Sequence, residues 1–255
     1  MILAVDIGNT NAVIGAFTGD KRLFLSRIST DRAKMPDDYA VIVKNIIELY
    51  GYKIEQIEGA IVSSVVPPVS ANLKSALKRL CPEIEVIEVG PGIKTGLNIK
   101  IDNPAQTGAD LVCVSVGAIK KYPLPSIVID MGTATTITAL DKNGNFLGGS
   151  IIPGVRISLD ALSGRTAQLP QINLGDTAEI IGKNTVDAMR SGVLLGQASM
   201  LDGMIQRYRE VLGEDMTVIA TGGIAGRIVC HCKEKVIYDE NLLLDGLRFL
   251  YEKNK

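Results

Sequence analysis

The sequence has few histidines and cysteines, the residues that metal centres, disulfide-stabilised folds and histidine-dependent hydrolases use. It holds one histidine, His231, and four cysteines in 255 residues. Nothing around His231 forms a nucleophile–histidine–acid pattern, so we interpret His231 as a structural or surface residue. The spacing of Cys81, Cys113, Cys230 and Cys232 suggests no disulfide framework, which is typical of a protein from a reducing compartment.

Three soft ligands adjoin in Cys230-His231-Cys232. Neighbours on a strand point to opposite faces, so the three side chains do not easily converge on one ion. No second ligand pair completes a zinc pattern. We therefore predict a late strand carrying small apolar thiols here rather than a metal site.

Long apolar runs and basic blocks are also missing. No uncharged apolar run reaches 18 residues, which argues against a membrane span, and the N-terminus lacks the basic region of a signal peptide. The formal net charge is −1 with both signs interspersed, so nucleic acid is not an expected partner. Together these features predict a cytoplasmic globular protein.

An internal duplication is present. Residues 2–14 and 126–137 each contain an apolar run that ends in Asp, a glycine turn and a β-branched strand. Aligning Asp6 with Asp130 aligns Gly8 with Gly132 and Asn11 with Thr135. A turn dipeptide follows in each copy, Gly19-Asp20 and Asn143-Gly144. Weak self-similarity is common in α/β proteins, but the matched order of features favours a true repeat.

The repeat predicts two similar α/β domains, each with a mixed sheet, over residues 1–115 and 116–255. Further elements fit this arrangement: a helix near 37–50, a helix over 108–121, and buried strands at 59–66 and 217–226. Pro67-Pro68 is interpreted as a loop that ends the first of these strands.

Glycine turns after strands suit phosphate binding, because backbone N–H groups can approach phosphate oxygens closely. The turns at 8–11 and 132–136 would grip a nucleotide triphosphate, and Asp6 and Asp130 would hold a cation or its water shell. The alternative is that Asp6 only caps a turn and the threonines are ordinary strand residues. Neither a P-loop nor a Gly-x-Gly-x-x-Gly fingerprint occurs.

Two helix starts carry further candidates. Thr107 is a plausible N-cap for the helix over 108–121, with Asp110 in its first turn. Asp110 either complements the helix dipole or accepts the proton of an attacking hydroxyl. Gly182-Lys183-Asn184-Thr185 precedes a helix over 186–212 that Thr185 would cap. Gly222-Gly223 suits a tight turn near a base or ribose.

In their order and spacing these motifs resemble the type III pantothenate kinases, and they are also similar to the Bvg accessory factor family. The resemblance rests on Asp6–Asn11, Gly108–Asp110, Asp130–Thr136, Gly149–Gly154, Gly182–Thr185 and Thr221–Gly223. It implies the actin–hexokinase superfamily fold, with two ribonuclease-H-like domains and a cleft between them. It further implies transfer of the ATP γ-phosphate to the hydroxyl of pantothenate, which opens coenzyme A biosynthesis.

The same resemblance implies roles for individual residues. Asp110 would be the catalytic proton acceptor, Asp130 would bind K⁺ or NH₄⁺, and Mg²⁺ would accompany ATP. A homodimer is implied, in which one protomer's Thr185 reaches the pantothenate of the other. The ATP residues would be Asp6, Ile7, Gly8, Asn9, Thr10, Asn11, Ala12, Val13 and Thr133. The pantothenate residues would be Ile101, Gly108, Ala109, Asp110, Leu111 and Thr185.

Two positions depart from the family pattern. Leu111 stands where the motif usually has Arg, and Ile101 stands where a Tyr is common. Arg offers a carboxylate a fork of donors, and loss of a charge-assisted hydrogen bond costs about 1.5–3 kcal/mol, or about tenfold or more in affinity. A compensating cation such as Lys100 is one option.

Three functions stay open: an active pantothenate kinase, a nucleotide-binding sensor that has lost catalysis, and a kinase of another small hydroxy acid.

Overall fold

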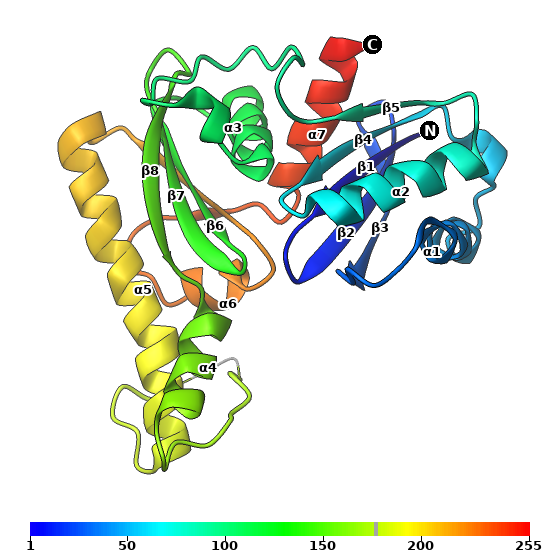
Figure 1. The fold of residues 1–255 in the computed structure, drawn as a ribbon. Helices are drawn as coiled ribbons and strands as arrows, with labels where there is room; N and C mark the ends of the chain where they lie inside the picture. The colour runs from blue at the N-terminus through cyan, green and yellow to red at the C-terminus, as the bar shows by residue number, and fades with distance from the viewer. Residues whose placement is uncertain (176–177) are drawn as a thin grey trace. The chain divides into compact units, whose positions relative to one another are not determined.

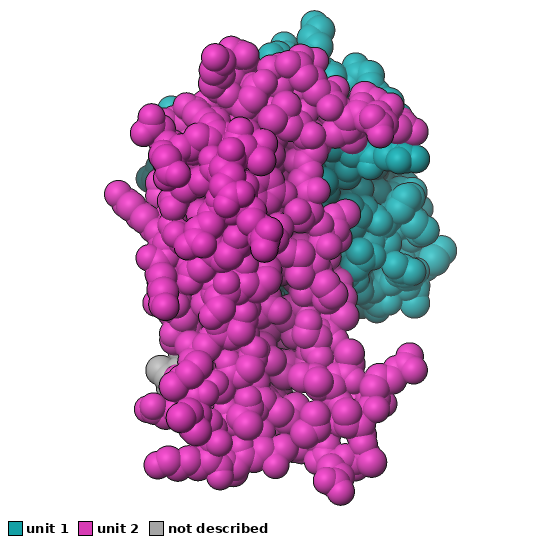
Figure 2. Space-filling view, turned by 90° about the vertical axis from the view of Figure 1, so that its left-hand side faces the viewer, with its two compact units in different colours: residues 1–96, 105–117, 242–255 teal, residues 97–104, 118–241 magenta. Residues whose placement is uncertain are grey.

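The computed structural model describes residues 1–175 and 178–255, and the chain divides into two compact units. Unit 1 contains residues 1–96, 105–117 and 242–255, and unit 2 contains residues 97–104 and 118–241 (Figure 2). This division differs from the predicted boundary after residue 115 in two main respects: residues 97–104 belong to unit 2, and residues 242–255 belong to unit 1. The last 14-residue stretch of chain returns to unit 1, because its helix packs on the sheet of that unit.

Unit 1 is built on a five-stranded mixed sheet (Figure 1). The central strand β1 pairs antiparallel with β2 and parallel with β4. The strands lie in the order β3 (Lys21–Ser29), β2 (Asn11–Thr18), β1 (Ile2–Ile7), β4 (Gly59–Ser64) and β5 (Glu85–Glu88). Gly19 has a φ of +54° in the turn between β2 and β3, as the predicted hairpin requires.

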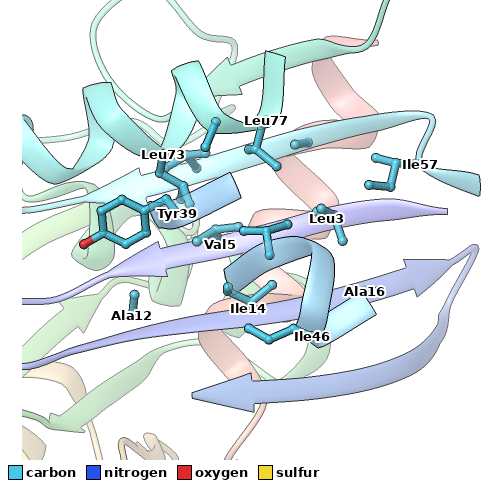
Figure 3. Packing of buried hydrophobic residues seen from close by; sticks show 14 of the residues in the cluster. Leu3, Val5, Ala12, Ile14, Ala16, Tyr39, Ile46, Ile57, Leu73 and Leu77 are labelled. Atoms are coloured by element: carbon cyan, nitrogen blue, oxygen red, sulfur yellow. The ribbon is translucent and has the colours of Figure 1, made fainter. Parts of the chain in front are cut away.

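Helices cover both faces of this sheet. One face carries α1 (Pro36–Leu49) and α2 (Pro67–Leu80). Figure 3 shows Leu3, Val5 and Ile14 of the strands directed toward Ile46 of α1 and Leu73 of α2. The opposite face carries α7 (Leu242–Asn254). The remaining elements of the unit are the 3₁₀ turns η1 (Ile54–Gln56) and η2 (Pro104–Gln106), the latter shared with unit 2, and α3 (Ala109–Lys121), whose last turn belongs to unit 2.

The helix α2 corrects a prediction. We expected Pro67 and Pro68 to open a loop, but they occupy the first positions of a 14-residue helix. Proline is favoured there because the first N–H groups of a helix have no intrahelical partner and the fixed φ suits the helix.

Unit 2 repeats the topology of unit 1 with a second five-stranded sheet. Its order is β8 (Phe146–Pro153), β7 (Ala134–Leu140), β6 (Ser126–Met131), β9 (Thr217–Thr221) and β10 (Ile237–Tyr238), so β6 corresponds to β1 and β9 to β4. The helices are α4 (Val155–Arg165), α5 (Thr185–Leu212) and α6 (Ala225–Val229). Because both the order and the strand directions match, the predicted duplication is confirmed.

The alignment of the two copies is shifted by one residue from our prediction. Ile7 pairs with Ala12 across the first hairpin, whereas Met131 pairs with Thr135 across the second. Thr135 therefore corresponds to Ala12 and not to Asn11. The first turn is one residue longer, which a gap-free alignment of Asp6 with Asp130 cannot show.

The core of unit 1 generates a stability prediction. Leu73 on α2 is 2% exposed, and its truncation leaves a cavity against the strands. We expect Leu73→Ala to lower the free energy of unfolding by about 2–5 kcal/mol in urea titrations. Leu49 is 80% exposed at the end of α1, so Leu49→Ala should change it by less than about 0.5 kcal/mol. Equal losses for the two variants would contradict the packing in Figure 3.

Candidate functional site

The first glycine turn joins β1 to β2. The Gly8 N–H donates to the Asn11 carbonyl at 3.0 Å and closes a four-residue turn at 8–11. Asp6 lies at the end of β1, on the face opposite that of the core residues Leu3, Val5 and Ile7. The register with β4 sets Ser63 beside Asp6. The sequence-predicted residues Asp6–Val13 thus form one continuous strand end, turn and strand start.

Asp110 occupies the first turn of α3, which begins at Ala109. Its Oδ1 accepts a hydrogen bond from the Leu111 N–H at 2.9 Å. Burial raises the pKa of Asp110 above its ordinary value, and the backbone hydrogen bonds only partly oppose this. A carboxylate that is poorly solvated and raised in basicity is suited to accept a proton.

The N-cap of α3 is not the residue that we predicted. Val112 N–H donates to the Gly108 carbonyl at 3.1 Å, so Gly108 precedes the helix. The Thr107 hydroxyl is buried and has no hydrogen-bond partner among the described residues. Thr107 therefore does not cap α3.

Cys113 is affected electrostatically by both Asp6 and Asp110, two of the candidate site residues of unit 1. Its side chain is fully buried on α3, and burial raises the pKa of this thiol well above its ordinary value. Asp6 and Asp110 both raise it further, so both carboxylates lie within electrostatic reach of one sulfur atom, which also lies near the Ser63 hydroxyl. Asp6 and Asp110 therefore act on the same buried thiol within unit 1. Sequence reasoning missed Cys113, although its place one turn after Asp110 puts it on the same helix face.

The second glycine turn joins β6 to β7. The Gly132 N–H donates to the Ala134 carbonyl at 3.0 Å, and Asp130 lies directly opposite Thr136 in the hairpin register. Opposed residues in an antiparallel pair point to the same face, so Thr136 lies beside Asp130. The Thr136 hydroxyl is buried without a partner among the described residues. Sequence reasoning placed Thr136 in the turn without seeing this juxtaposition.

Two glycines let other segments approach this turn. Gly222 has a φ of +100°, and a Cβ there would lie 2.7 Å from Asp130 Oδ1. A Cβ at Gly154 would lie 2.1 Å from the Thr133 carbonyl oxygen. The predicted motifs at 149–154 and 221–223 therefore meet at Asp130–Thr133, and any side chain at either glycine would displace the turn.

A pocket of about 700 Å³ lies between α4, the segment before α5, and α5 itself. Helix α5 is capped by Asn184, whose side chain accepts from the Asp187 N–H at 3.0 Å, so the prediction of Thr185 as the cap is wrong. Thr185 is instead the exposed first residue of the helix and lines the pocket. The lining includes Ser158, Leu162, Lys183, Thr185, Met189 and Gln197.

The remaining candidate residues belong to different units. Ile101 belongs to unit 2, and its Cγ2 would lie 3.5 Å from a Cβ at Gly148. Gly108–Leu111 belong to unit 1. Cys230 ends the short helix α6 and is exposed, so the predicted strand at 230–232 is wrong. Across residues 1–175 and 178–255, no group of three or more His, Cys, Asp or Glu side chains could hold a metal ion.

Comparisons with known proteins assign the family. The family model for type III pantothenate kinases matches residues 2–207. A type III pantothenate kinase from Exiguobacterium is 45% identical over all of both chains, and one from Geobacillus is 44% identical over all of this chain and 98% of its own. The chain belongs to the type III pantothenate kinase family.

Solved structures agree with the fold. A putative Baf family transcriptional activator from Campylobacter jejuni has a TM-score of 0.60 at 19% identity, covering 99% of this chain and 98% of its own. The ethanolamine utilization protein EutJ from Carboxydothermus hydrogenoformans has a TM-score of 0.54 at 15% identity, covering 97% and 89%. These structures share the fold of this chain, and its two mixed sheets with flanking helices agree with the predicted α/β fold class. None of the helices in the described ranges is both long and apolar enough to cross a membrane.

The raised pKa of Asp110 generates a prediction about stability. A raised folded-state pKa favours the protonated form, so its contribution is complete at low pH and is lost as pH rises through that pKa. At neutral pH we therefore expect Asp110→Asn to be more stable than the native chain, with the difference closing as pH falls. Urea unfolding between pH 4 and 8 measures this.

The exposed Asp215 provides the control. As a substitution at the surface, Asp215→Asn should change the free energy of unfolding by less than about 0.5 kcal/mol. If Asp110→Asn is destabilised at neutral pH, the carboxylate is held by interactions stronger than its desolvation, and our account of the site is wrong.

Proposed function

We propose that this protein transfers the γ-phosphate of ATP to the primary hydroxyl of pantothenate, the first step of coenzyme A biosynthesis. The observation that carries the proposal is the half-buried Asp110, whose pKa is raised by desolvation and which acts with Asp6 on the same buried thiol, in a chain of this kinase family. A cytoplasmic location accords with such a biosynthetic role.

Phosphoryl transfer requires positioning and charge neutralisation more than covalent chemistry. The turn at 8–11 offers backbone N–H groups and the side chains of Asn9, Thr10 and Asn11 to phosphate oxygens. Asp6 would hold Mg²⁺ through its water shell, and that ion would supply neutralisation of the phosphates. Asp110 would accept the proton from the pantothenate hydroxyl as the phosphorus–oxygen bond to it forms.

Asp130 would bind a monovalent cation in unit 2. Potassium prefers oxygen ligands, and the buried Thr136 hydroxyl without a partner lies on the same face as Asp130. Gly222 approaches Asp130 Oδ1 closely and, because it has no side chain, does not occupy the space beside that oxygen. The residues present therefore fit such an ion, and Thr133 next to them would contact ATP.

Pantothenate would lie against Gly108–Leu111, with Ile101 contributing apolar contact. A homodimer would complete this site through Thr185. In support of a dimer, the exposed apolar side chain of Leu162 lines the pocket beside Thr185, and the Gln197 Oε1 in the same lining lacks a donor in the described structure. Leu162 is 40% exposed, and exposed apolar residues also precede lining residues in the chain: Ile157 (44%) before Ser158, and Ile180 (74%) and Ile181 (77%) before Gly182.

A nucleotide-binding sensor is the second candidate function. Leu111 in place of the motif Arg favours it, because an apolar side chain offers no donor to the pantothenate carboxylate. Phosphorylation of another small hydroxy acid is a third candidate on the same ground.

An enzymatic assay separates these functions. With ATP, Mg²⁺ and K⁺, we expect the protein to phosphorylate pantothenate and Asp110→Asn to lower kcat by about 10²–10⁴-fold, because the proton acceptor is lost. Binding of a non-hydrolysable ATP analogue should persist in the variant. Nucleotide binding without turnover by the native protein would establish the sensor, and turnover of other hydroxy acids alone would establish the third function.

The cation site makes a separate prediction. Activity should require K⁺ or NH₄⁺ and not be supported by Na⁺, and Thr136→Val should raise the K⁺ concentration needed for half-maximal rate by about tenfold. Thr138→Val, two residues along the same strand, should leave that concentration unchanged. Equal rates in potassium and sodium would remove the role given to Asp130.

A further inference from the structure

A short segment after β3, Thr30–Met35, is attached directly to the first glycine turn. The Thr30 N–H donates to the Thr10 carbonyl at 2.9 Å, and the Thr30 hydroxyl donates to the Gly8 carbonyl at 2.7 Å. Both bonds go to backbone atoms of the turn itself. The start of the segment is therefore fixed relative to the residues that would bind phosphate.

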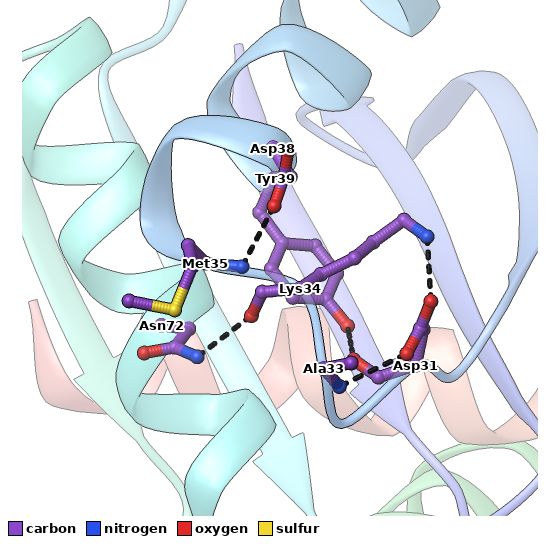
Figure 4. Close-up of polar contacts among 7 residues, drawn as sticks. All are labelled: Asp31, Ala33, Lys34, Met35, Asp38, Tyr39 and Asn72. Atoms are coloured by element: carbon purple, nitrogen blue, oxygen red, sulfur yellow. Dashed lines mark hydrogen bonds and ion pairs between the residues drawn. The ribbon is translucent and has the colours of Figure 1, made fainter.

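The rest of the segment is held by a network with α1 and α2 (Figure 4). Asp31 accepts from the Ala33 N–H at 2.9 Å and from Lys34 Nζ at 2.8 Å. The Tyr39 hydroxyl donates to the Asp31 carbonyl at 2.8 Å, and Asn72 Nδ2 donates to the Lys34 carbonyl at 2.9 Å. Because Tyr39 is 1% exposed, this network anchors the segment to the core of unit 1.

The two cations on the segment differ in what neutralises them. The hydrogen bond to Asp31 raises the pKa of Lys34, so Lys34 is committed to an ion pair. Arg32 is exposed and has no carboxylate within 4.0 Å among the described residues. Its Nη2 donates instead to Asn9 Oδ1 at 3.4 Å, a long contact to a side chain of the glycine turn. The segment thus presents one unneutralised guanidinium at the turn.

We propose that Arg32 binds the terminal phosphate of ATP at the turn at 8–11, an inference that rests on the nucleotide site of the proposed function. The long bond to Asn9 is easily exchanged for shorter charge-assisted bonds to phosphate oxygens. The guanidinium is always charged and offers a planar fork of donors, which suits an anion whose charge spreads over several oxygens during transfer.

The position of Asp110 indicates which phosphate Arg32 meets. The reacting phosphorus must lie next to the hydroxyl that Asp110 deprotonates. Asp6 and Asp110 share the neighbourhood of Cys113, so the phosphate closest to this turn is the terminal one. The carboxylate of pantothenate is a different anion, and its binding by Arg32 is an alternative that the experiment below excludes or establishes.

The test compares Arg32→Gln and Arg32→Lys with the native chain by calorimetric binding of AMP, ADP and a non-hydrolysable ATP analogue. We expect Arg32→Gln to weaken the ATP analogue by about tenfold and AMP by less than about twofold. Arg32→Lys should restore part of the affinity, since it keeps the charge but loses the fork. In steady-state assays KM for ATP should rise while KM for pantothenate stays unchanged.

Arg22 provides the matched control, because it is exposed at the far end of β3, paired with Phe17, and lies away from the turn. Arg22→Gln should bind all three nucleotides as the native chain does. Unchanged affinity of Arg32→Gln for the ATP analogue would overturn the inference and leave the proposed function standing. Equal weakening for AMP, or a change confined to KM for pantothenate, would also overturn it.

The two proposals fail separately. If the native protein binds the ATP analogue but does not phosphorylate pantothenate, the proposed function fails and the binding series still decides the role of Arg32. If the native protein binds no adenine nucleotide, both are wrong.

Discussion

The register of each central strand between its two neighbours determines where the functional carboxylates point. In unit 1, β1 alternates core residues Leu3, Val5 and Ile7 with residues on the opposite face, and Asp6 is the last of these. A slip of one residue would direct Asp6 into the core and expose the apolar set, so the burial of that set fixes the register and with it the carboxylate. The same argument applies to Asp130 on β6, whose alternate neighbours Ile129 and Met131 belong to the core of unit 2. The hydrophobic effect therefore positions two acids that contribute nothing to the cores themselves.

The half-buried Asp110 on α3 shows the opposite relation between stability and function. Asp110 is desolvated, and its two backbone hydrogen bonds do not cancel the loss of water. This arrangement destabilises the folded protein at neutral pH but increases the basicity of the carboxylate, which is what a proton acceptor requires. The same desolvation raises the pKa of the fully buried Cys113 well above its ordinary value and disfavours the reactive thiolate. Desolvation thus makes the Asp110 carboxylate more basic and keeps the Cys113 thiol protonated.

Local features were predicted well from the sequence, and features that depend on distant segments were not. The strand–Asp–Gly turn units are contiguous in the chain, so their pattern alone revealed the duplication and the fold. Pro67-Pro68 was misread because two prolines suit both a loop and a helix start, and only the following apolar spacing distinguishes them. Asn184 rather than Thr185 caps α5 because both residue types are good caps and the chain geometry chooses between neighbours. The contact of Arg32 with Asn9 joins two sides of a hairpin, and a sequence without coordinates gives no distance for it.

The choice between a kinase and a nucleotide sensor depends on whether the features that only catalysis needs are retained. Leu111 removes a donor for the acid substrate, which favours a sensor. Binding of a nucleotide, however, requires phosphate donors and a cation, and the proposed site takes these from the turn at 8–11 and from Asp6 and Asp130 rather than from the half-buried Asp110. An asparagine at position 110 would accept the same Leu111 N–H bond without the desolvation of a charge, so a protein that only binds nucleotide has no use for Asp110. Asp110 is desolvated at a cost in stability, and its presence is a stronger argument for proton transfer than Leu111 in place of the motif Arg is against it. That loss affects affinity for the acceptor, whereas Asp110 determines whether the acceptor can react.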